Sequence, residues 1–122
     1  MFLTDKKVGD PVVESVSEIT SITYLGDVDS NTQNGPQYYN IVKPGGGFKS
    51  FQLNVPTYNA QDLLSQEVVT VGNTKVSATF NEGSNTKYTY TCTVNSLGTF
   101  KLKIGYRVNG VPTTIYGPPF TL

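Results

Sequence analysis

The sequence contains no histidine and no tryptophan, and its single cysteine is Cys92. Histidine is the commonest general base and metal ligand near neutral pH, and a nucleophilic cysteine needs a basic partner. One cysteine also cannot form a disulfide within the chain. We therefore expect no enzyme activity, no cofactor and no zinc site, and we expect Cys92 to be a buried, inert thiol.

Long apolar runs are also missing, so no segment is predicted to span a membrane. The first eleven residues carry charges where a secretory signal would be apolar. Nine basic residues balance nine acidic ones, so no net field attracts nucleic acid or an anionic membrane. We expect a soluble protein without nucleic-acid partners or membrane insertion. The lack of disulfides favours a cytoplasmic location, with an extracellular or particle-surface location as the alternative.

The residues that are present favour strands and turns. Residues 87–94 and 99–108 each alternate apolar and polar side chains with a period of two, which is typical of strands with one buried face. The expected inward-facing side chains are Tyr88, Tyr90, Cys92 and Val94 in the first segment and Phe100, Leu102, Ile104, Tyr106 and Val108 in the second. The two segments are predicted to run antiparallel, either within one sheet or across a sandwich.

Several further strands can be predicted, at residues 38–42, 47–55, 66–71, 75–80 and 113–122. Asn109 and Gly110 predict a tight turn before the last of them, and Pro118 and Pro119 place that strand at a sheet edge or a bulge. Residues 12–24 have strand propensity without clean alternation, so we expect the leading strand to bulge or to switch sheets. Only residues 58–65 suggest helix, of one turn or less.

These segments predict an all-β fold, an immunoglobulin-like antiparallel β-sandwich of about seven to nine strands. We expect residues 1–122 to form a single domain. Residues 1–46 are expected to be an irregular leading strand with loops, and residues 47–122 to be the core of the sandwich.

Two minor ligand sites need consideration. Asp27, Asp29 and Asn31 alternate as in calcium-binding loops, but Thr32 replaces the glycine of the sharp turn and Tyr38 replaces the bidentate glutamate. A loop rich in Asp and Asn is the favoured interpretation, and calcium binding stays open. A second group of side chains, expected in loops or near edges, suits either ordinary packing or a protein or carbohydrate site. Its members are Tyr38, Tyr39, Tyr58 and Tyr116.

The C-terminal half resembles filamin-type immunoglobulin-like repeats in the order of its features. These are a strand ending in a polar turn at residues 80–83, a Thr-Tyr alternating strand at 87–90, a Gly-aromatic strand start at 97–100, a turn at 108–110 and a closing Gly-Pro-Pro-Phe segment at 117–120. The resemblance covers roughly the last forty per cent of the chain. The first half departs from the family pattern.

The resemblance implies a non-catalytic rod segment or docking platform, a role common in actin cross-linking proteins. Family members bind partner peptides by adding a strand beside their third and fourth strands, which would match residues 66–71 and 75–80 here. The candidate partner-binding residues are Gln66, Val68, Val69, Val71, Lys75, Val76, Ala78 and Phe80.

A second hypothesis is an extracellular adhesion, coat or shell subunit that self-assembles. Acidic residues crowd the first quarter of the chain, at Asp10, Glu14, Glu18, Asp27 and Asp29, and basic residues crowd the last third, at Lys87, Lys101, Lys103 and Arg107. This asymmetry is compatible with head-to-tail assembly.

Overall fold

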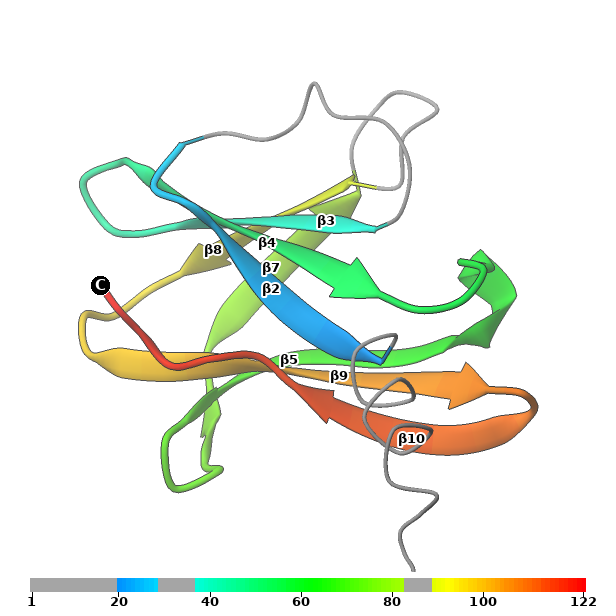
Figure 1. Ribbon diagram of the computed structural model, residues 1–122. Coiled ribbons are helices and arrows are strands. Elements are labelled where there is room, and N and C mark those ends of the chain that lie inside the picture. Colours follow the sequence, from blue (N-terminus) through cyan, green and yellow to red (C-terminus); the bar gives the residue numbers. More distant parts are fainter. Residues whose placement is uncertain (1–19, 29–36, 83–88) are drawn as a thin grey trace, which may run out of the picture.

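Two β-sheets pack face to face in the computed structural model, which describes residues 20–28, 37–82 and 89–122 (Figure 1). The sheet that we call the β3 sheet contains, in spatial order, β2 (Ser21–Gly26), β4 (Phe48–Asn54), β3 (Tyr38–Val42), β8 (Thr89–Val94) and β7 (Ala78–Glu82). The β9 sheet contains β10 (Val111–Tyr116), β9 (Thr99–Val108), β5 (Leu63–Thr70) and β6 (Lys75–Val76), with β11 (Phe120–Thr121) paired to β9. The predicted all-β sandwich is confirmed, and the 3-10 turn Ala60–Asp62 is the only helical element in the described residues.

Alternation of side chains builds the core between these sheets. In β9, Phe100, Leu102, Ile104 and Tyr106 are buried while the residues between them are at least partly exposed, as predicted. Cys92 and Val94 of β8 face the same interior. The buried core cluster consists of Ile22, Tyr39, Ile41, Phe51, Leu53, Val68, Cys92, Val94, Phe100, Leu102, Ile104, Tyr106, Ile115 and Phe120. Because β8 and β9 lie in different sheets, they face each other across the sandwich.

The predicted tight turn joins β9 to β10. Asn109 and Gly110 have φ values of 53° and 80°, and Val108 pairs with Val111 directly across the turn. Both central residues of a type I′ turn need positive φ, which Asn and Gly tolerate. The strand predicted over residues 113–122 is divided at residues 117–119 into β10 and β11, which both pair with β9 at the edge of the sheet. Pro118 and Pro119 lie in this break, and Phe120 of β11 is buried in the core.

The strand order differs from an immunoglobulin sandwich at one place. The orders β10-β9-β5 and β8-β7 match the G-F-C and E-D neighbours of that fold, but β3 lies between β4 and β8. β3 pairs antiparallel with β4 on one side and parallel with β8 on the other. The sheets are therefore not antiparallel throughout. The described residues form ten strands instead of seven to nine, because β6 and β11 are separate two-residue strands.

The strand predicted at residues 38–42 is present as β3, but it lies in the middle of its sheet and contributes to the core. Tyr38, Tyr39, Asn40 and Ile41 are all buried, and β3 is paired on both sides in the middle of its sheet. The expected loop or edge position of Tyr38 and Tyr39 is therefore wrong. The bulge expected in the leading strand is present between Tyr24 and Gly26 of β2, and residues 1–19 lie outside the described part of the chain.

A buried glutamine precedes β3. The backbone carbonyl of Gln37 accepts a hydrogen bond from the Leu53 N–H at 2.8 Å, but its side-chain amide has no hydrogen-bond partner among the described residues. The amide lies beside Tyr39, close enough to lower the pKa of that hydroxyl slightly against the larger effect of burial, without the geometry of a hydrogen bond. A buried polar group left unpaired costs about 1–3 kcal/mol.

We expect Gln37→Met to raise the free energy of unfolding by about 1 kcal/mol, because it keeps the volume and removes the unpaired amide. Urea unfolding measures this change. Asn40→Leu is the matched control: Asn40 accepts a 2.7 Å hydrogen bond from the buried Ser50 hydroxyl, so its loss should destabilise the protein. A Met variant less stable than the native chain would contradict the prediction.

Candidate functional site

The predicted binding residues lie where the chain crosses from one sheet to the other. The sequence suggested one strand over residues 75–80, but the structure divides it at Ser77. Lys75 and Val76 form β6 and pair with β5, whereas β7 pairs with β8 in the opposite sheet. Figure 1 shows β7 rising from the lower layer to the upper one. Val76, Ala78 and Phe80 remain partly buried against the core on both sides of the crossing.

The structure removes part of the predicted site from reach. Val68 and Val69 are fully buried, and each pairs with β9 on one side and with β6 on the other. A strand with neighbours on both sides cannot take up another. Val71 follows β5 in an exposed turn, which is closed by a 2.8 Å hydrogen bond from the Thr70 N–H to the Thr74 carbonyl.

The hydrogen-bond alternation of the β3 sheet shows which way the β8 backbone points. Antiparallel partners alternate between hydrogen-bonded and non-bonded pairs. Gln37, which directly precedes β3, and Leu53 of β4 form a hydrogen-bonded pair. The register continues without a shift, so Tyr38 and Asn40 belong to non-bonded pairs with β4. Their backbone N–H and C=O groups therefore point to the other side of β3, toward β8. The parallel ladder then uses alternate residues of β8 and leaves Thr91 and Thr93 to bond with β7.

β7 consequently has a free edge. Its residues Thr79 and Asn81 pair with Thr93 and Thr91, so their backbone groups serve the ladder. The N–H and C=O groups of Ala78, Phe80 and Glu82 point to the other side, where no strand of the described residues lies. We call these three residues the β7 edge.

Phe80 anchors the β7 edge to an aromatic cluster. Its ring meets Tyr39 edge to face, with 6.0 Å between the ring centroids, and Tyr39 stacks on Tyr90 at 5.5 Å. Tyr39 is fully buried, and burial raises the pKa of its hydroxyl well above the usual value. Phe80 itself is only partly buried, so an apolar surface reaches the free edge.

Glu82 ends this strand beside the aromatic cluster. It is exposed and lies directly opposite Tyr90 in the ladder. Burial raises the pKa of Tyr90, and the carboxylate of Glu82 adds to that shift. Within the described residues, Glu82 forms no ion pair.

β5 has an open side next to the same crossing. β6 pairs only with Val68 and Val69, so the preceding part of β5 has β9 as its sole neighbour among the described residues. Gln66, which belongs to the predicted site, lies in this part. Its side-chain carbonyl is buried and has no hydrogen-bond partner in the described part of the chain. The crossing thus leaves two strand edges of the sandwich open.

The basic residues of β9 are largely balanced within their own sheet. Lys103 lies 3.9 Å from the carboxylate of Glu67, and Arg107 lies 3.9 Å from that of Asp62. The ammonium of Lys101 lies 4.4 Å from the centre of the Tyr116 ring. Lys101, Lys103 and Arg107 thus contact groups of their own chain, whereas the assembly hypothesis expects these basic side chains to contact a second copy. Of the acidic residues in that hypothesis, only Asp27 belongs to the described part of the chain.

Asp27 has protein partners of its own. Its carboxylate accepts a 2.8 Å bond from Lys49 and a hydrogen bond from the Tyr24 hydroxyl. Asp29 and Asn31, the other members of the calcium hypothesis, lie outside the described residues. No cluster of three or more potential metal-binding acids or thiols occurs in the described ranges.

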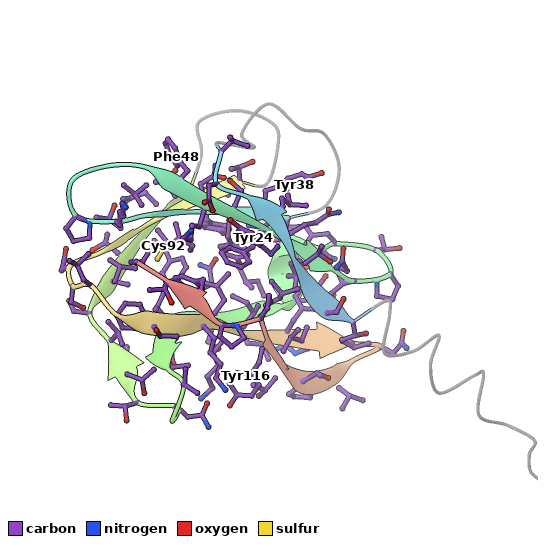
Figure 2. The ribbon with its side chains drawn as sticks, turned by 60° about the vertical axis from the view of Figure 1, so that its left-hand side comes forward. Tyr24, Tyr38, Phe48, Cys92 and Tyr116 are labelled. Carbon is purple, nitrogen blue, oxygen red and sulfur yellow. The ribbon has the colours of Figure 1, made fainter. Side chains whose placement is uncertain are left out.

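Tyr24 is an exposed aromatic residue that the sequence analysis did not single out. It is 42% exposed and lines a hollow of about 230 Å³ together with Lys49 and residues 118–121. Figure 2 shows Tyr24 and Tyr116 on different parts of the molecule. Tyr24 faces inward like Ile22, but β2 is an edge strand, so less of the opposite sheet covers it. Tyr116 lies in the edge strand β10, in agreement with its expected position, and is 43% exposed.

Cys92 lies inside the sandwich, between the two sheets (Figure 2). Its side chain is fully buried in the core cluster. Burial raises the pKa of the thiol to about 12. The expectation of a buried thiol is confirmed.

No helix in the described ranges is long and apolar enough to cross a membrane. Comparison with protein-family models, with curated proteins and with solved structures gives no match for this chain.

We expect native Cys92 to react with iodoacetamide at pH 8 at least tenfold more slowly than the urea-unfolded chain, because the thiolate is the reactive form. The thiol of the unfolded chain has a pKa of about 8.5, and the thiol of the folded chain has a pKa of about 12. Mass spectrometry follows the alkylation. Equal alkylation rates would show that the site is open.

The same two pKa values predict how stability depends on pH. The contribution of Cys92 to the free energy of unfolding is complete below the pKa of the unfolded chain and falls as pH rises toward the pKa of the folded chain. Urea unfolding of the native chain and of Cys92→Ala at several pH values separates the pH dependence of stability that is due to Cys92 from that due to the tyrosines.

Proposed function

We propose that this domain is a non-catalytic protein-interaction module that takes up an extended partner segment as an added strand at the β7 edge. The observation that carries the proposal is the row of backbone groups at Ala78, Phe80 and Glu82 that pair with no strand of the described residues, next to a half-buried apolar surface. In strand addition, such backbone groups supply affinity and adjacent side-chain contacts supply selectivity. The filamin-type resemblance supports the proposal, since that family binds peptides beside the corresponding strands.

The other edges of the sandwich carry features that discourage pairing. β10 contains Pro112, which removes a backbone donor on the outer side, because Val108 and Val111 form the bonded pair that closes the hairpin. β2 has a bulge, the open part of β5 has an irregularity between Leu63 and Ser65, and β6 is only two residues long. Prolines, bulges and short strands are the usual protections of sheet edges. β7 has five residues without proline, lysine or a bulge, so it is the edge best suited to a partner.

Self-assembly is the second candidate, and the same edge favours it. Two copies of β7 pairing antiparallel about Phe80 would place Phe80 against Phe80 and Ala78 opposite Glu82. No like charges would then lie directly opposite each other. A concentration-dependent dimer in analytical ultracentrifugation that Phe80→Glu abolishes would favour this candidate over binding of a different protein.

The double variant Ala78→Pro/Glu82→Pro tests the site, because it removes two of the three free donors and leaves the β7–β8 ladder bonds in place. We expect peptides selected from a random display library on the native chain to slow amide hydrogen exchange at these residues. Their affinity should fall at least tenfold in the double variant, whose melting curve should stay close to native.

Asn81→Pro is the matched control, because the N–H of Asn81 belongs to the ladder. Its loss should destabilise the protein, because a proline in a paired position removes a hydrogen bond of the ladder. Selected peptides that protect other strands, or that bind the double variant at native affinity, would refute the proposal.

A further inference from the structure

We infer that the partner strand presents an apolar residue opposite Phe80 and a lysine or arginine opposite Glu82, two positions away. This inference rests on the proposed function, because it specifies the chemistry of the segment that the β7 edge accepts. The cation precedes the apolar residue if the partner runs antiparallel to β7 and follows it if the partner runs parallel. The motif is therefore short and directional.

The first part of the motif follows from the face on which the β7 side chains lie. Ala78, Phe80 and Glu82 share one face because side chains alternate along a strand. A partner residue directly opposite any of them would have its Cβ about 4.5–5.5 Å from the β7 Cβ, on the same face. Those partner residues would therefore continue the inner face of the β3 sheet.

Phe80 determines the apolar position. Its ring is partly buried and is supported from the interior by Tyr39, which stacks on Tyr90. Tyr39 is fixed by full burial, so the apolar surface beside Phe80 is rigid. A partner aromatic or branched aliphatic side chain would cover the exposed part of this ring, and such cross-strand pairs stabilise sheets. A polar side chain would leave the ring in contact with water.

Glu82 determines the charged position. Its carboxylate is exposed and has no ion-pair partner among the described residues. An opposite charge directly across a ladder is favourable, and a like charge is unfavourable. The outer face gives no comparable restriction, because Thr79 and Asn81 are exposed and uncharged. The discriminating contacts are therefore confined to alternate residues of the partner.

The test compares peptide selection on the native chain and on Glu82→Lys at low salt. We expect the native chain to enrich Lys or Arg two residues from an apolar anchor. The variant should enrich Asp or Glu at the same position with the anchor unchanged. A peptide selected on the native chain should bind Glu82→Lys about three- to tenfold more weakly, in line with one cross-strand charge pair. This difference should shrink in 0.5 M salt.

Glu67→Lys is the matched control, because it makes the same change of charge in the β9 sheet, where Glu67 pairs with Lys103. It should leave the selected motif unchanged. Peptides that protect the β7 amides but show no charge preference, or the same preference on Glu82→Lys, would overturn this inference and leave the proposed function standing. Peptides that never protect β7 would remove both.

Discussion

The crossing at Ser77 is the constraint on which both the closed core and the open edge depend. β6 and β7 are separated by one residue, yet they pair with strands of different sheets. The backbone therefore ties the two sheets together at one margin, and Val76, Ala78 and Phe80 pack against the core on either side of the tie. The same crossing shortens β6 and leaves β7 with one neighbour. The crossing therefore both closes the core at this margin and leaves the β7 edge accessible.

The position of β3 explains why the margin of the sandwich is apolar as well as open. Because β3 lies between β4 and β8, its sheet is five strands wide. The opposite sheet is only four strands wide, because β10 and β11 pair with different parts of the same strand, β9. The outermost strands of the wider sheet have less surface to cover them. Tyr24 of β2 and Phe80 of β7 both face inward and both remain partly exposed. In the middle of the sheet, by contrast, Tyr39 and Ile41 are fully buried.

Much of the fold could be predicted because a strand with one buried face has a period of two. The alternation in β9, the positive-φ turn at Asn109 and Gly110, and the edge position of the last predicted strand were all predicted correctly, although the structure divides that strand into β10 and β11. β3 was predicted as a strand, but its central position was not, because a strand buried on both faces lacks the alternation that shows an inward side. Of the predicted binding residues, Val68 and Val69 proved to be interior, whereas Ala78 and Phe80 lie on the β7 edge. Glu82 was missed, since nothing next to it in the chain distinguishes it from any surface acid.

The amino-acid pattern alone was sufficient for the all-β class, the inward positions of β8 and β9 and the burial of Cys92, because these depend on neighbours one to four residues apart. Strand partners depend on contacts between residues far apart in the chain, so only the tertiary structure revealed the parallel β3–β8 pair and the change of sheet at Ser77. Whether a backbone N–H is bonded or free is decided by those partners and not by the residue that carries it. The β7 edge is therefore a property of the assembled sheets.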